Sequence, residues 1–180
     1  MKIIAVIPAR YKSTRLTNKP LIQIHNKPLI QLTYEAVVNT NLFDSIYITT
    51  DAKKIQTISE SFGATCILTS TENRNGTERC VELIQKIDES VSDNDIIINI
   101  QCDEPFIQKR HIKKLINLFK DDVIGTLITP LKTSEITDQS IVKTIVTGDL
   151  EAIDFARTNK NWPKTKKLFK HIGVYAYTKK

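Results

Sequence analysis

Residues 8–20 form a polar segment whose side chains could bind phosphate. The segment reads PARYKSTRLTNKP and offers Arg10, Arg15 and Lys19 beside the hydroxyl of Ser13. Guanidinium and ammonium groups, together with backbone N–H donors, make a cradle suited to the oxygens of a polyphosphate. The segment has no glycine, so it is neither a Walker A loop nor a GxGxxG fingerprint. A solvated basic loop explains the same charges, and the choice depends on where the segment lies in the fold.

Two further polar segments add a carboxylate and a helix start. Residues 101–105 read QCDEP, and Asp103 there could hold Mg²⁺ together with substrate phosphates, although a turn cap is the alternative interpretation. Residues 75–79 read NGTER, and Asn75 stands three residues before a glutamate, which is the spacing of a capping box. Gly76 permits a close backbone approach, and a helix N-terminus favours an anion or a polar base edge.

Composition excludes several classes of protein. The 180 residues are 41% hydrophobic and 26% charged, which is typical of a globular domain. The 3 cysteines form no CxxC and the 3 histidines are scattered, so neither a disulfide framework nor a local zinc site is expected. The net charge of +6 suits anionic partners such as nucleotides, acidic sugars or nucleic acid. No apolar run approaches the roughly 18 residues of a membrane span, so a cytoplasmic protein without a membrane partner is predicted.

Strand-like and helix-like segments alternate along the chain. Apolar runs predict strands at residues 3–7, 46–48, 65–68, 96–100 and 123–128, with amphipathic helices between them. Asp51 is expected to cap the second helix and Gly63 to follow its end. In the third helix, the predicted buried stripe is Val81, Ile84 and Ile87.

This alternation predicts an α/β fold, with a mostly parallel sheet and helices on both of its faces. Beyond Pro130, extended segments around 141–146 and 171–177 follow without helices between them. They predict an antiparallel addition within one domain spanning residues 1–180. Ligands of open α/β sheets bind beyond the carboxyl ends of the strands. The polar segments follow such strands, which favours the phosphate interpretation.

The combination of motifs is more specific than any one of them. The segments IPARYKSTRL with Lys19–Pro20, NGTER, INIQCDEP and HIGVYAY occur in the order and spacing of one enzyme family. Over all 180 residues, the chain resembles the 3-deoxy-manno-octulosonate cytidylyltransferases. The resemblance implies a Rossmann-like nucleotidyltransferase fold, usually dimeric, that makes CMP-Kdo and pyrophosphate from CTP and 3-deoxy-D-manno-octulosonate (Kdo). It also implies a requirement for Mg²⁺ and a place in lipopolysaccharide biosynthesis.

The resemblance assigns roles to individual residues. Arg10 and Lys19 are the implied catalytic residues, which hold the triphosphate and offset charge on the leaving pyrophosphate. The implied nucleotide-binding residues are Ala9, Arg10, Ser13, Lys19, Asn75, Gly76 and Thr77. The implied sugar-acid residues are Arg15, Gln101, Arg157, His171 and Tyr175. Among these, Arg157 is the candidate for the sugar carboxylate, and Asp103 is the implied metal ligand.

The sequence departs from the family pattern at three places. Thr17–Asn18 stands where the family usually has Pro-Gly, which predicts a loop less tightly preset for phosphate. Cys102 replaces a glycine, which predicts crowding of the nucleotide, or strain if the position needs a positive φ. Family members continue past the counterpart of Lys180 through a helical segment and a second metal-binding aspartate. We therefore expect these 180 residues to bind CTP better than they turn it over.

Two alternatives follow from the same sequence. One is a catalytically impaired remnant of the family that at most binds CTP. The other is a basic nucleic-acid-binding protein, suggested by the lysines between residues 160 and 170, with Trp162 and Phe169 nearby for stacking on a single strand. The sequence contains no nucleic-acid-binding motif, so the enzyme interpretation is favoured over this one.

Overall fold

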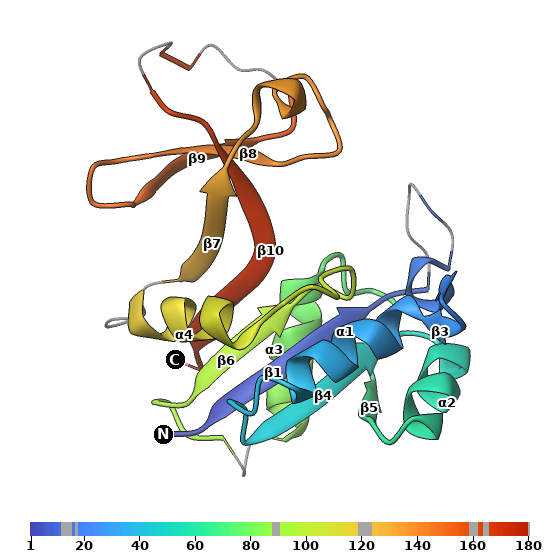
Figure 1. The fold of residues 1–180 in the computed structure, drawn as a ribbon. Helices are drawn as coiled ribbons and strands as arrows, with labels where there is room; N and C mark the ends of the chain where they lie inside the picture. The colour runs from blue at the N-terminus through green and yellow to red at the C-terminus, as the bar shows by residue number, and fades with distance from the viewer. Residues whose placement is uncertain are drawn as a thin grey trace. The chain divides into compact units, whose positions relative to one another are not determined.

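The computed structural model describes residues 1–11, 16, 18–87, 91–118, 124–158, 162–163 and 166–179. They divide into two compact units: unit 1 is Met1–Gly125 with Val174–Lys180, and unit 2 is Thr126–Gly173. Strand β10 (Phe169–Thr178) contributes to both units (Figure 1). Each unit is described below by itself, and the single domain that the sequence predicts stays a prediction.

Unit 1 is built on a mostly parallel sheet. Its strand order is β5–β4–β1–β6–β10, with β1 at Ile3–Ala9, β4 at Ser45–Thr50, β5 at Thr65–Leu68 and β6 at Ile96–Ile100. The pairs β1–β4, β1–β6 and β4–β5 are parallel, whereas β10 runs antiparallel to β6. This arrangement confirms the predicted α/β class.

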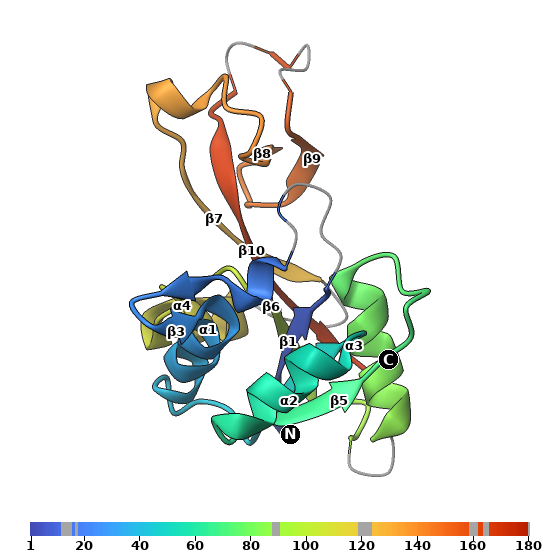
Figure 2. The same cartoon turned by 90° about the vertical axis from the view of Figure 1, so that its right-hand side faces the viewer.

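Helices connect the parallel strands of unit 1, and a further helix follows the last of these strands. They are α1 (Leu29–Val38), α2 (Lys53–Ser61), α3 (Gly76–Lys86) and α4 (Lys109–Leu118), and the short elements η1 (Lys19–Leu21), β2 (Gln23–Ile24) and β3 (Lys27–Pro28) precede α1. The strand order runs outward from β1 to β5 and then returns to β6. Right-handed crossovers therefore place α1 and α2 on one face and α3 on the other. Figure 2 shows α1 and α3 on opposite sides of β1.

The packing of α3 on the sheet corrects one sequence prediction. A core cluster joins β1 and β6 to one face of this helix, and its buried members are Ile4, Val6, Cys80, Leu83, Ile84, Val91 and Ile97. Val81, predicted to be buried, is 50% exposed. Cys80 takes the inward position instead, because a free cysteine behaves as a small apolar side chain. One of the three predicted stripe residues was therefore wrong.

The ends of the helices confirm two predictions and contradict a third. Gly63 follows α2 with φ +85°, the left-handed conformation that glycine adopts without strain. Asn75 caps α3, since its side-chain oxygen accepts the N–H of Glu78 at 2.9 Å. Asp51 does not cap α2, whose N-cap residue is Ala52 without a side-chain bond. Its carboxylate binds residues distant in the sequence, as described below.

Unit 2 is antiparallel, as predicted. It contains β7 (Gly125–Pro130), η3 (Thr133–Glu135), β8 (Lys143–Val146), β9 (Ala152–Ala156) and the first half of β10. Strand β8 pairs antiparallel with both β9 and β10, and β7 also pairs with β10. The sequence did not predict β9.

Candidate active site

The first and third polar segments meet because they follow neighbouring parallel strands. Pairing of Ile3 with Ile96 and of Val6 with Asn99 sets β1 beside β6 with their carboxyl ends at the same edge. An ion pair between Lys19 and Asp103 then joins the two segments across that edge. The two side chains are 31% and 36% exposed, so a ligand can reach both charges.

The second polar segment packs against the same edge. Gly76 begins α3 at a point where a Cβ atom would lie only 2.9 Å from Cγ of Pro8. Only glycine lets the helix start approach β1 this closely. Arg10 bridges the same two segments, because its Nη1 donates to the carbonyl oxygen of Arg74 at 3.2 Å. A guanidinium group therefore lies near a helix N-terminus, which is a favourable place for an anion.

Two contacts fix the backbone around this edge. Thr33 of α1 is fully buried and donates its hydroxyl to the carbonyl oxygen of Cys102 at 2.8 Å. Asn18 donates its N–H to the carbonyl oxygen of Tyr11 at 3.4 Å, which joins the two ends of the segment between them. The backbone directly before Asp103 and directly before Lys19 is therefore held by a hydrogen bond.

The backbone conformation tests two of the departures from the family pattern, those at Asn18 and Cys102. Asn18 has φ 58°, a left-handed conformation that asparagine tolerates better than most residues. It thus takes a backbone conformation of the kind that a glycine would supply. Cys102 has no positive φ, so the predicted strain at this position is wrong. Burial raises the pKa of the Cys102 thiol to about 12, which keeps the thiol protonated and unreactive near neutral pH.

A buried arginine that the sequence analysis missed lies behind this edge. Arg79 of α3 is 1% exposed, and its Nη2 pairs with Oδ2 of Asp51 at 2.8 Å. Its Nη1 donates to Oγ1 of Thr69 at 2.7 Å and to the carbonyl oxygen of Ser70 at 3.1 Å. The other carboxylate oxygen of Asp51 accepts the N–H of Tyr11 at 2.9 Å. The sequence feature that could have revealed Arg79 is its position directly before Cys80, on the inward face of α3.

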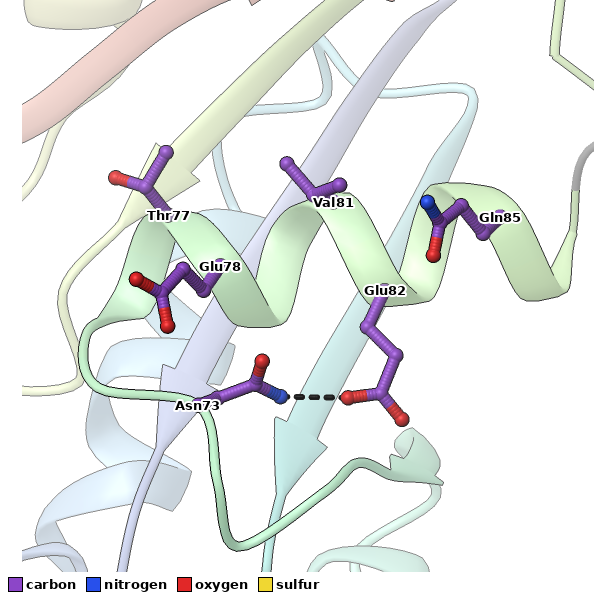
Figure 3. A pocket seen from close by; sticks show the side chains of 6 residues that line it. All are labelled: Asn73, Thr77, Glu78, Val81, Glu82 and Gln85. Atoms are coloured by element: carbon purple, nitrogen blue, oxygen red, sulfur yellow. Dashed lines mark hydrogen bonds between the residues drawn. The ribbon is translucent and has the colours of Figure 1, made fainter.

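A hollow of about 400 Å³ lies along α3, and its lining does not include Arg10, Lys19 or Asp103. Figure 3 shows its lining side chains, Asn73, Thr77, Glu78, Val81, Glu82 and Gln85, with the strands behind the helix. Only Thr77 belongs to the predicted site. A hydrogen bond from the Arg74 backbone lowers the pKa of Glu78. Burial works to raise the pKa of Glu82, but hydrogen bonds, chiefly from Lys86, outweigh it and lower that pKa. Two ionised carboxylates make this hollow unsuited to a triphosphate.

The remaining predicted residues of unit 1 lie on or just after the strands. Ala9 is the fully buried last residue of β1 and pairs with Thr50. Tyr175 of β10 is half-buried and pairs with Asn99, two residues before Gln101. Ser13 and Arg15 lie outside the described residues. Among the described residues, no group of three or more histidine, cysteine or carboxylate side chains could hold a metal ion, so Asp103 is a single candidate ligand.

Unit 2 holds the two other predicted sugar-acid residues, Arg157 and His171. Nη1 of Arg157 donates to the carbonyl oxygen of Ser140 at 2.6 Å. The ring of His171 contacts Oγ1 of Thr126 at 3.0 Å and packs edge-on against Phe155, with ring centroids 5.2 Å apart. Burial, and then the charge of Arg157, lower the pKa of His171. The imidazole is therefore neutral near pH 7 and suited to hydrogen bonding.

The aromatic residues considered for nucleic-acid stacking already have partners in unit 2. Trp162 donates its indole N–H to Oδ2 of Asp154 at 3.0 Å, and Nζ of Lys167 lies 5.4 Å from the ring centroid of Phe169. Lys160 and Lys164 lie outside the described residues. The contacts that are described do not favour the nucleic-acid alternative.

Comparison with known proteins points to one group of enzymes. The family model described as Cytidylyltransferase matches residues 4–180. The chain is 38% identical over 189 residues to the 3-deoxy-manno-octulosonate cytidylyltransferase of Cytophaga hutchinsonii, covering 98% of this chain and 74% of the relative. It is 40% identical over 185 residues to the enzyme of that name from Francisella tularensis subsp. novicida, covering 96% and 73%.

Solved structures agree with this similarity. A CMP:2-keto-3-deoxy-manno-octonic acid synthetase complexed with CTP superposes with a TM-score of 0.85 at 34% identity, covering 99% of this chain and 75% of that one. A 4-diphosphocytidyl-2C-methyl-D-erythritol synthase superposes with a TM-score of 0.65 at 14% identity, which is a likeness of fold alone. No helix in the described part of the chain is long and apolar enough to span a membrane.

Proposed function

This chain belongs to the cytidylyltransferase family, among the 3-deoxy-manno-octulosonate cytidylyltransferases, and from this premise we propose that it transfers a cytidylyl group from CTP to Kdo. The single observation that carries the proposal is the Lys19–Asp103 pair at the shared edge of β1 and β6. It supplies a phosphate-binding cation and a metal-binding carboxylate at one place, where α/β sheets bind their ligands.

In the proposed reaction, the anomeric hydroxyl of Kdo attacks the α-phosphorus of CTP. A new oxygen–phosphorus bond forms, the bond to the bridging oxygen of the β-phosphate breaks, and pyrophosphate leaves with the electron pair while the hydroxyl proton passes to water. Arg10 and Lys19 hold the triphosphate and stabilise the charge that develops on pyrophosphate. The turn at Asn75, Gly76 and Thr77, together with the backbone of Ala9, binds the cytosine and ribose of CTP.

The donor set fits a magnesium ion held by one protein ligand. Asp103 offers an accessible carboxylate, and Mg²⁺ readily completes its octahedron with water and substrate phosphate oxygens. When bound, the ion would neutralise the charge of the triphosphate. Lys19 balances the Asp103 carboxylate in this structure. When CTP is present, its phosphates compete for Lys19, and the Asp103 carboxylate becomes free to bind Mg²⁺.

The acidic sugar requires a different set of groups. Arg157 supplies a guanidinium that can bind the Kdo carboxylate with two parallel hydrogen bonds. In the same unit, neutral His171 can hydrogen-bond a hydroxyl group, and Gln101 and Tyr175 of unit 1 are further candidates for binding hydroxyl groups. The family resemblance further supports a role in lipopolysaccharide biosynthesis, a cytoplasmic location and a homodimer as parts of the same proposal.

Nucleotide selectivity tests the first half of this function. A ligand that binds only the native state raises the melting temperature in proportion to its affinity and concentration. With Mg²⁺ present, CTP should raise the melting temperature of this chain more than ATP or GTP does at equal concentration. Equal shifts from all three nucleotides would mean that the site recognises phosphate without recognising cytidine, and would contradict the proposal.

A further inference from the structure

The Asp51–Arg79 pair is unusual because it is buried. Its side chains are only 12% and 2% exposed, whereas every other ion pair found between described residues has a partner at least 34% exposed. Burying two charges costs desolvation energy that their attraction often fails to recover. Stability alone is therefore a weak reason for the pair, and its contacts suggest another.

Arg79 joins three parts of unit 1 at the carboxyl edge of the sheet. Its guanidinium belongs to α3, and one of its nitrogens binds Asp51, which directly follows β4. The other nitrogen binds Thr69 and Ser70, which directly follow β5. A planar fork of this kind fixes the direction of each bond, which a flexible ammonium does not.

Asp51 extends this network to the phosphate-binding segment. Its Oδ1 accepts the N–H of Tyr11 at 2.9 Å, while the carbonyl oxygen of Tyr11 accepts the N–H of Asn18 at 3.4 Å. Both backbone polar groups of Tyr11 are therefore held. Arg10 directly precedes Tyr11, and Lys19 directly follows Asn18, so both proposed phosphate-binding cations adjoin the point that Asp51 holds.

We propose that Asp51 and Arg79 form a positioning pair, which sets the backbone of Arg10 and Lys19 for the CTP triphosphate without contacting the nucleotide. This inference rests on the proposed roles of Arg10 and Lys19. Phosphate contacts depend steeply on geometry, and a displacement of about 1 Å costs on the order of 100-fold in rate. Loss of the pair therefore weakens CTP binding more than it weakens Kdo binding.

Asp51→Asn is the most informative variant. It keeps the shape of the side chain but removes the charge, and its amide cannot satisfy both Tyr11 and the Arg79 guanidinium as the carboxylate does. Arg79→Lys keeps the charge but removes the fork. Leu83→Ala is the matched control, because it destabilises α3 from a fully buried position without touching the pair. Glu35→Gln breaks the exposed Lys27–Glu35 pair, whose atoms are 2.7 Å apart, and controls for charge.

The measurement is CTP binding in the presence of Mg²⁺ by titration calorimetry, well below each variant's melting temperature, with steady-state KM values for both substrates. We expect Asp51→Asn and Arg79→Lys to bind CTP at least tenfold more weakly, with the KM for Kdo changed less than twofold. Both control variants should bind CTP normally. If folded Asp51→Asn binds CTP within twofold of the native chain, or if Leu83→Ala weakens CTP binding equally, the positioning role is wrong. If Arg10→Ala and Lys19→Ala also bind CTP normally, the proposed function itself fails.

Discussion

Each compact unit buries a long cationic side chain, but the two charges are compensated differently. In unit 1, Arg79 pairs with the carboxylate of Asp51 at 2.8 Å. In unit 2, Lys143 is 1% exposed, and its Nζ donates to the backbone carbonyl oxygens of Asp138, Ile141 and Arg157. One cation has an anionic partner in contact, and the other is held by neutral dipoles.

The way in which each buried cation is compensated matches the charge of the ligand proposed for its unit. In unit 1, Asp51 neutralises Arg79, so the cations proposed to bind the triphosphate are the exposed Arg10 and the partly exposed Lys19. In unit 2, the ammonium group of Lys143 donates its hydrogen bonds to backbone carbonyl oxygens. Hydrogen bonds from Ser140 lower the pKa of Asp138 most, and the charge of Lys143 lowers it further. The same positive field favours the carboxylate of an acidic sugar.

The largest predicted effect comes from removing each buried cation in turn. Arg79→Met leaves the Asp51 carboxylate without its buried partner, which should lower the free energy of unfolding by about 3–5 kcal/mol. Lys143→Met leaves three neutral carbonyl groups of exposed or half-buried residues, which water can partly satisfy, so we expect a cost of about 1–2 kcal/mol. Urea unfolding of both variants measures the difference. A larger cost for Lys143→Met would contradict the comparison.

A smaller effect concerns the histidine beside Arg157. Because burial and Arg157 lower the pKa of folded His171, the unfolded chain binds this proton more readily. The stability that neutral His171 contributes is complete above the unfolded pKa of about 6.5 and is lost as the pH falls through the folded pKa. His171→Gln should therefore flatten the dependence of stability on pH below about 6.5.

A further prediction is that the charge of Arg157 acts on His171 and not on His111. Arg157→Ala should raise the pKa of His171 in an NMR titration, because it removes a nearby positive charge. His111 of unit 1 is the control: burial, Arg110 and Lys114 lower its pKa, and none of these changes in the variant. An unchanged His171 titration would show that burial alone accounts for the shift and would remove Arg157 from this part of the account.

Local patterns were enough to predict the parts of the fold that depend on neighbouring residues. The apolar runs at 65–68 and 96–100 coincide with β5 and β6, because apolar residues dominate both runs and β6 is buried along its whole length. Gly63 and Asn75 have the predicted roles at the ends of helices because capping involves residues close in the sequence. The same reasoning placed the polar segment at residues 8–20, which we propose binds phosphate, at the end of β1.

Contacts between distant residues account for most of what was not predicted. Asp51 has the sequence context of a helix cap, but its carboxylate binds Arg79, 28 positions away, and Tyr11, 40 positions away. Lys143 carries no local signal of burial, because its partners come from a loop and from the end of β9. The roles of Arg157 and His171 came from the family resemblance rather than from periodicity or spacing.

The most direct test of the account is pyrophosphate release from CTP by this chain with Mg²⁺, with and without Kdo. We predict release that depends on Kdo and falls at least ~100-fold in Lys19→Ala, because a cation on the leaving pyrophosphate acts mainly in the transition state. Lys27→Ala is the matched control, since Lys27 forms an exposed ion pair with Glu35, and it should keep the native rate. Release that is independent of Kdo, or a near-native rate in folded Lys19→Ala, would contradict the central claim.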